Sequence, residues 1–178
     1  TISGVANRTY NSNGSLIYGA GNEITNSVTS LYDIPTNSGN SAKAFAETLR
    51  TVIKNNNGAG ATLAIGGGNS ADYTQASQLI GVNNILKGAS GSVSKYNMID
   101  GYKNTADNVN NVSVVGSNNS VSSTNTAVVL GDNRTLTGAS NSVVIGSSAS
   151  GLTTSVANAV AIGSETNVTE NGGGGAWL

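Results

Sequence analysis

A short aliphatic motif recurs along this chain at nearly constant spacing, and no other feature restricts the possible folds so strongly. After Val114, four aliphatic segments each end on a glycine, at Gly116, Gly131, Gly146 and Gly163. The steps between these glycines are 15, 15 and 17 residues. A pair of helices needs a repeat of ~34 residues, whereas short aliphatic runs between turn signals are typical of β-strands. The repeat therefore predicts a β-solenoid with one coil per copy.

Earlier copies of the repeat add two further positions to the pattern. Asparagine stands three residues after the glycine at Asn22, Asn69, Asn84, Asn104 and Asn119, and an aliphatic or alanine residue follows two positions later. Glycine and asparagine adopt positive φ more readily than other residues, so we expect each Gly-x-x-Asn to form a corner between two strands. The predicted fold is all-β, a parallel β-roll of ~15-residue coils over 15–28 and 60–170, with strands ~4.8 Å apart.

Two stretches interrupt the repeat. The step from Gly19 to Gly66 is 47 residues, which indicates an insertion over 31–57. Within it, apolar residues recur on one helical face, which predicts one short α-helix over about 41–54 that begins at Asn40 or Ser41 and ends at 55–58. We expect Phe45, Leu49 and Ile53 to pack on the coils. A second, shorter interruption predicts an extended loop over 87–96.

Charge and composition exclude several classes of function. The net charge is −1 and 10% of residues are charged, which gives no basis for binding nucleic acid. Histidine and cysteine are absent, so metal sites of imidazole or thiolate and nucleophiles activated by histidine are excluded. No run of ~20 apolar residues is present, so we expect no direct membrane insertion of this segment.

Catalysis would have to depend on carboxylates. Asp100, Asp107 and Asp132 stand near corners but are isolated from one another in sequence. A glycosidase-like pair could still form in space, as in solenoid enzymes that act on polysaccharides. Those enzymes have larger coils and aromatic platforms for sugars, so we expect a non-catalytic protein with no cofactor and no metal.

Three copies of the motif resemble the head repeats of YadA-like trimeric autotransporter adhesins. They are Asn125-Thr-Ala-Val-Val-Leu-Gly131, Asn141-Ser-Val-Val-Ile-Gly-Ser147 and Asn158-Ala-Val-Ala-Ile-Gly-Ser164. The resemblance implies a left-handed parallel β-roll in an intertwined homotrimer, held at the surface of a Gram-negative bacterium. It implies anchoring in the outer membrane through parts of the protein outside residues 1–178, which we expect to be a single head fragment. The insertion 31–57 is not part of the common pattern, and the glycine-rich 171–178 would form either an edge towards the neck or an artificial end of the chain.

Trimerisation also agrees with the size of the coils. A coil of ~15 residues offers few aliphatic positions, so burial against other chains would add apolar area at ~25 cal/mol per Å². On the family's pattern, six aliphatic residues are structural positions of the roll and its trimer core, not ligand contacts: Val128, Leu130, Val143, Ile145, Val160 and Ile162.

The resemblance implies adhesion to a host. Members of the family bind collagen, fibronectin or laminin, and others bind carcinoembryonic-antigen-related cell adhesion molecules. Insertions carry function more often than regular scaffold, and tyrosine and arginine are favoured at binding hot spots. The candidate receptor contacts are therefore Tyr32, Asp33, Arg50, Lys54, Tyr73 and Tyr102. The alternative is a structural spacer or autoagglutination module that binds no receptor.

Overall fold

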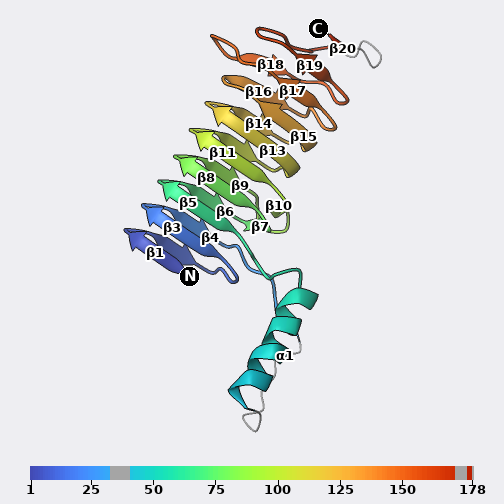
Figure 1. Cartoon of the computed structure of the whole chain (residues 1–178). Helices are drawn as coiled ribbons and strands as arrows, with labels where there is room; N and C mark the ends of the chain where they lie inside the picture. Colours follow the sequence, from blue (N-terminus) through green and yellow to red (C-terminus); the bar gives the residue numbers. More distant parts are fainter. Residues whose placement is uncertain (33–40, 171–175, 178) are drawn as a thin grey trace.

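The computed structural model describes residues 1–32, 41–170 and 176–177, and shows a column of stacked β coils with one helix (Figure 1). Two parallel sheets run along the column. The main path of the large sheet is β1(Ile2–Val5), β3(Leu16–Ala20), β5(Leu63–Gly67), β8(Gln78–Val82), β11(Met98–Tyr102), β13(Asn110–Ser117), β15(Asn125–Leu130), β17(Val143–Ile145), β19(Val160–Ile162) and β20(Ala176–Trp177). Short strands β7(Thr74–Gln75) and β10(Ser94–Lys95) pair beside that path. The small sheet holds β2(Arg8–Tyr10), β4(Glu23–Thr25), β6(Ser70–Asp72), β9(Ile85–Lys87), β12(Thr105–Asp107), β14(Ser120–Ser122), β16(Arg134–Thr137) and β18(Leu152–Thr154).

Successive coils pair in one constant register. The repeat glycines stand opposite one another from Gly19 through Gly66, Gly81 and Gly101 to Gly116. Because the strands are parallel, equivalent residues of every coil form straight columns along the solenoid. The prediction of a mostly β fold built from stacked parallel coils is confirmed.

The core is narrow and continuous. The large sheet contributes one inward column that runs Ile17, Ala64, Leu79, Ile99, Val114, Val129, Val144 and Ala161, and β13 and β15 add Val112 and Ala127 beside it. The small sheet contributes the column Ile24, Ala71, Leu86, Ala106, Val121 and Leu136. All of these side chains are buried, and each valine, leucine or isoleucine contributes about 1.5–3 kcal/mol.

Repeat glycines occupy places where only glycine fits. Gly101 has φ +122°, and a Cβ atom built on it would lie 2.0 Å from the carbonyl oxygen of Gly116 in the next coil. Such a distance is far inside van der Waals contact, so a side chain here would force the two coils apart. The prediction that these glycines adopt positive φ is confirmed, and the structure shows that they also permit close backbone approach.

The repeat asparagines have a role that differs from the one expected. Positive φ falls on the residue before the asparagine, such as Asn83, Lys103 or Asn118, and not on Asn84 or Asn104. The expectation that the asparagine turns the corner through its own backbone is wrong. A corner residue needs only to adopt positive φ, which several residue types can do. The next position needs an amide side chain, because that side chain forms hydrogen bonds to the neighbouring coils.

Six stacked asparagines form a ladder inside the coils: Asn7, Asn22, Asn69, Asn84, Asn104 and Asn119. Asn104 Nδ2 donates to Asn84 Oδ1 at 3.0 Å and to the Gly116 carbonyl at 2.7 Å. Its backbone N–H also donates to Asn84 Oδ1, at 3.1 Å. Each asparagine from Asn22 to Asn119 therefore joins three successive coils, Asn7 joins the first two, and the buried amides of the ladder are paired.

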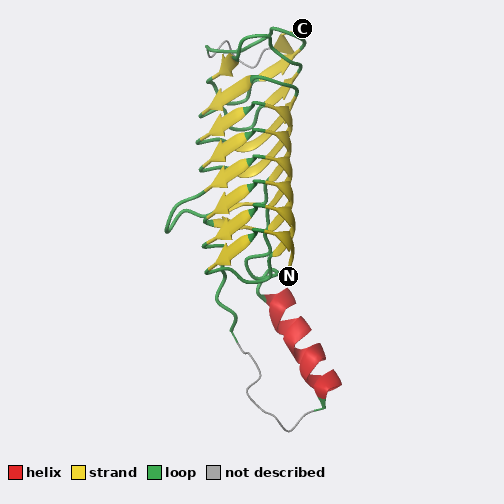
Figure 2. Cartoon of the chain, turned by 90° about the vertical axis from the view of Figure 1, so that its left-hand side faces the viewer, coloured by secondary structure: helices red, strands yellow, loops and turns green. Residues whose placement is uncertain are grey.

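The predicted helix is present as α1(Ala42–Asn55). Ser41 caps it, with the Ala44 N–H donating to Ser41 Oγ at 3.3 Å, and Asn56 closes its other end. The expectation that Phe45, Leu49 and Ile53 pack on the coils is wrong. Figure 2 shows α1 extending away from the end of the column, and within the helix only Val52 is buried.

The ends of the insertion explain this position. Asn13 Oδ1 accepts the N–H groups of Thr29 at 3.1 Å and Gly60 at 2.8 Å, so the chain leaves and rejoins the coils at one side chain. The described helix between these residues, α1, lies outside the coils, at the N-terminal end of the column (Figure 2). The shorter loop within 87–96 is also present, with a tight turn in which Ala89 and Ser92 pair.

Candidate functional site

The outer face of the large sheet carries three columns of side chains that point away from the core. The first column holds Leu63, Gln78, Met98, Ser113, Val128, Val143 and Val160. The middle column holds Ile65, Ile80, Asp100, Val115, Leu130, Ile145 and Ile162. The third column follows one edge of the sheet and holds Gly67, Val82, Tyr102 and Ser117. We call these three columns together the outer face.

All six residues predicted for a trimer core lie on the outer face. Val128 is 43% exposed, Leu130 46% and Ile162 39%, while Val143, Ile145 and Val160 are half-buried. The residues between them in sequence, such as Val129 and Val144, fill the core of the chain itself. The structure thus places the six residues on strands of the solenoid with their side chains directed outward, and their role in a trimer stays a prediction.

Apolar side chains are concentrated on this face. Half of the large hydrophobic residues that are exposed in the described chain belong to it or continue its columns into β3: Leu16, Tyr18, Val82, Tyr102, Val128, Leu130 and Ile162. An exposed apolar surface of this kind marks a site of association more often than a surface left in water.

One carboxylate interrupts the apolar middle column. Asp100 pairs in register with Ile80 on one side and Val115 on the other. Asp107 lies instead on the small sheet, exposed, and Asp132 accepts hydrogen bonds from the Ser117 N–H at 2.7 Å and Ser147 Oγ at 3.1 Å. The three carboxylates considered for catalysis therefore belong to three different columns.

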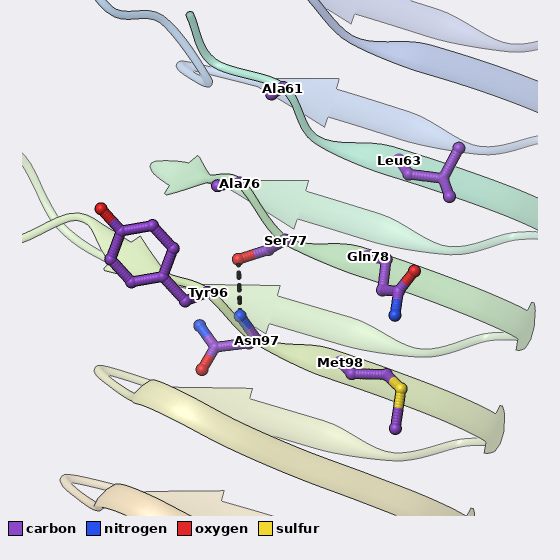
Figure 3. A pocket seen from close by; sticks show the side chains of 8 residues that line it. All are labelled: Ala61, Leu63, Ala76, Ser77, Gln78, Tyr96, Asn97 and Met98. Atoms are coloured by element: carbon purple, nitrogen blue, oxygen red, sulfur yellow. Dashed lines mark hydrogen bonds between the residues drawn. The ribbon is translucent and has the colours of Figure 1, made fainter. Parts of the chain in front are cut away.

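A hollow of about 510 Å³ lies beside the first column, at the edge where the chain turns into the large sheet. It is lined by Ala61, Leu63, Ala76, Ser77, Gln78, Tyr96, Asn97 and Met98 (Figure 3). Ala61, Ala76 and Tyr96 are equivalent corner residues with positive φ, so small side chains in two coils leave space next to a tyrosine in the third. Beneath it, Ser77 Oγ accepts the Asn97 N–H at 3.1 Å.

A second hollow of about 300 Å³ continues along the same edge. Its corner residues are Asn111, Thr126 and Asn141, and its sheet residues include Val128 and Val143. The two hollows follow one another along the same edge of the outer face, with the larger one beside Ala76 and the smaller one towards the C-terminal coils.

The predicted receptor contacts fall in separate places. Tyr32 is 70% exposed at the start of the insertion, and Arg50 and Lys54 are exposed on α1, where Arg50 pairs with Glu47. Asp33 lies outside the described residues. Tyr73 is a half-buried corner residue with φ +50°.

Tyr102 belongs to the third column of the outer face, with Lys103 Nζ 5.1 Å from its ring centre. The structure therefore places Tyr32, Arg50 and Lys54 in or beside the insertion, and Tyr73 and Tyr102 elsewhere on the coils.

Arg134 is a buried residue that the repeat pattern did not bring to attention. It takes the position of the next ladder asparagine, and its backbone N–H donates to Asn119 Oδ1 at 2.9 Å. Its side chain continues into the C-terminal coils, where Nη2 donates to the Thr166 carbonyl, but Nε and Nη1 have no partner. Burial lowers the pKa of Arg134, while the charge of Glu165 acts in the opposite direction. The signal in the sequence was a basic residue at the position that asparagine holds in the six preceding coils.

No metal cluster and no membrane-spanning helix is found in the described ranges. Within 1–32, 41–170 and 176–177, histidine, cysteine, aspartate and glutamate form no group of three that could hold a metal ion. In the same ranges, α1 does not have the length and apolar character needed to cross a membrane. Comparison with protein-family profiles, curated proteins and solved structures finds no match to this chain.

Proposed function

We propose that this chain is the head segment of a trimeric bacterial surface adhesin, a left-handed parallel β-roll that presents the insertion 31–57 to a host protein. The observation that carries the proposal is the apolar outer face. In a lone chain Val128, Leu130 and Ile162 stay in contact with water, whereas three copies that share this face bury them. Handedness, location at the cell surface and anchoring in the outer membrane through other parts of the protein come from the resemblance to YadA-like heads.

A threefold arrangement suits the geometry of this face. Three sheets around one axis turn their middle columns towards the axis, so Ile65, Ile80, Leu130, Ile145 and Ile162 would meet their own symmetry copies. Every coil then meets the equivalent coil of its neighbours, because a threefold rotation about an axis parallel to the column includes no translation along that axis. The constant register within the chain makes the same contact repeat along the column.

The insertion is the region proposed to contact the host. Tyr32 and the helix residues Arg50 and Lys54 are exposed, and Phe45 is 39% exposed on a helix that extends beyond the coils. Aromatic and arginine side chains contribute most to protein interfaces, and three insertions around one axis would add avidity. Asp33 belongs to the same insertion by sequence, whereas Tyr73 and Tyr102 are weaker candidates because they lie on the coils.

Two classes of partner follow from the resemblance, namely a host-cell receptor of the carcinoembryonic-antigen-related cell adhesion molecule group and the matrix proteins collagen, fibronectin and laminin. An insertion that departs from the common repeat favours a specific protein receptor. Matrix binding by the repetitive coil surface is the less favoured of the two.

Deletion of the insertion tests the proposal. Asn13 holds both ends of the insertion together, so a variant that lacks 31–57 should keep its coils. The variant and the parent are compared for binding to immobilised receptors and matrix proteins by surface plasmon resonance, and for mass by light scattering. We expect a trimer in both and loss of binding in the deletion. A control variant that lacks 89–92, the tip of the other loop, should bind like the parent.

A structural spacer or autoagglutination module is the second candidate, favoured by the regular columns and the continuous asparagine ladder. It predicts trimers that bind none of these proteins, with or without 31–57, and that clump beads or cells coated with them. A stable folded monomer at high protein concentration would contradict the trimeric assembly itself.

A further inference from the structure

We propose that the hollow beside Tyr96 is a socket between copies of this chain, filled by Val82 and Tyr102 of a neighbouring copy. The proposal rests on the trimeric assembly argued above and identifies the side chains that close each boundary between subunits. It assigns Tyr102 to the assembly instead of to a receptor.

The position of the hollow leads to this assignment. The hollow lies along the first-column edge of the outer face, and Val82 and Tyr102 lie along the third-column edge. When three outer faces surround one axis with their middle columns inward, the first-column edge of each copy meets the third-column edge of the next. Val82 and Tyr102 are then at the same height as Gln78 and Met98, because each pair belongs to one strand.

The two edges match in shape along the column. The hollow exists because Ala61 and Ala76 are small. At the heights of Ala61, Ala76 and Tyr96 the opposing column carries Gly67, Val82 and Tyr102, of which the last two are each 43% exposed. Val82 therefore stands opposite the space that Ala76 leaves, and the longer Tyr102 stands one coil further along, opposite Tyr96. The second hollow, of about 300 Å³, lies beside the next three coils, where the third-column positions are Ser117, Asp132 and Ser147.

The lining of the hollow also suits these two side chains. Ala61, Leu63, Ala76 and Met98 supply apolar wall for the valine and the tyrosine ring, and Ser77, Gln78 and Asn97 add polar groups. The second hollow combines the polar corners Asn111, Thr126 and Asn141 with the apolar Ala127, Val128 and Val143.

A filled hollow provides the first test. Ala76 has φ +46°, and the equivalent residue one coil later is Tyr96 with φ +60°, so the backbone of this corner accepts a tyrosine. Ala76→Tyr should therefore fold but block the socket, and we expect about tenfold or more weaker trimer association by light scattering over a dilution series. The matched control is Asn108→Tyr, at a corner away from the outer face where Tyr73 is the natural equivalent, and it should associate like the parent.

Disulfide trapping provides the second test. The chain has no cysteine, so Ala76→Cys combined with Val82→Cys adds the only two thiols. Within one chain these residues stand at opposite edges of the outer face, six residues apart and roughly 15–20 Å distant, too far for a disulfide. Oxidation should yield covalent trimers on a non-reducing gel, whereas Ala76→Cys combined with Ser120→Cys, on the small sheet, should not.

The outcomes separate the two proposals. Covalent trimers together with weakened assembly of Ala76→Tyr support the socket. Trimers that form no disulfide, or that tolerate Ala76→Tyr, overturn the socket and leave the trimeric adhesin standing. A parent protein that is monomeric at all concentrations overturns both. Loss of receptor binding by the Ala76→Tyr trimer, with assembly unchanged, would show that the hollow receives a receptor side chain and would also reject the socket.

Discussion

Asn104 and Asn119 lie one coil apart, and Asn119 Nδ2 donates to Asn104 Oδ1 over 2.9 Å inside the solenoid. The same Nδ2 atom donates to the Gly131 carbonyl at 2.7 Å, which belongs to the following coil. One amide therefore bonds to the coils on both sides of its own, and this connection repeats from Asn22 to Asn119. It explains why glycine and asparagine recur together: the glycine carbonyl accepts from the asparagine, and the absent Cβ lets the coils approach closely.

Asn104→Ala should destabilise the solenoid by about 3 kcal/mol, because Asn84, Asn119 and the Gly116 carbonyl each lose one of their buried hydrogen bonds. The measurement is the denaturation midpoint followed by circular dichroism. Asn55→Ala, an exposed asparagine at the end of α1, is the control and should change the midpoint little. Equal midpoints for the two variants would contradict the structural role of the ladder.

Gly101→Ala should destabilise the protein by about 3 kcal/mol or more, because its Cβ would lie 2.0 Å from the Gly116 carbonyl oxygen. Gly91→Ala separates this clash from backbone strain. Gly91 also has positive φ, +81°, but a Cβ there meets nothing within 4 Å. We expect it to lose only about 1 kcal/mol in the same thermal unfolding experiment. A similar loss for both alanines would mean that strain, and not close approach, fixes the repeat glycines.

Arg134→Met should raise stability by about 1–3 kcal/mol, since it keeps most of the side-chain volume and removes two buried N–H groups that have no partner. Burial lowers the pKa of Arg134, so the charged form is less favourable in the folded chain than in the unfolded chain. This penalty is present at every pH below that pKa, and the gain should be the same at pH 6 and pH 8. Arg134→Ala, which leaves a cavity, should lower stability instead. A loss of stability in the methionine variant would show that the contact with Thr166 outweighs the unpaired groups.

Asp100→Ile should strengthen the proposed trimer. Three copies of Asp100 around an axis would repel one another between the apolar Ile80 and Val115. The variant should remain trimeric at urea concentrations that dissociate the parent, as measured by light scattering. Asp107→Ile, on the exposed side of the small sheet, is the matched control and should dissociate with the parent. Weaker association of Asp100→Ile would mean that the middle column does not face the axis.

The solenoid itself could be predicted from the sequence because the residues that form each coil are close together in the chain and recur at a fixed spacing. The spacing of Gly116, Gly131 and Gly146 fixes the coil length, and the apolar spacing around Phe45 and Leu49 identifies the helix. The position of α1 could not be predicted in the same way. An amphipathic helix indicates that its apolar face needs a partner, but not that the partner is its own chain.

The sequence does distinguish the residue that turns the corner from the asparagine that follows it in the ladder. The corner position varies among Gly68, Asn83 and Lys103, whereas the next position is asparagine in every one of these coils. A position that needs only positive φ tolerates several residues, and a position that needs an amide tolerates one. The hollow beside Tyr96 could not be predicted from any short stretch of the sequence, because its lining residues come from three coils that only the strand pairing brings together.

The constant register makes whole coils exchangeable units of length. A chain that lacks residues 102–116 would follow Gly101 directly with Ser117, Asn118 and Asn119, so the glycine–asparagine spacing, and with it the ladder, would continue unbroken. Its rod would be shorter by ~4.8 Å, the separation of neighbouring strands. In the adhesin head proposed above, gain or loss of such units would set the reach of the insertion step by step, while each contact between coils stayed the same.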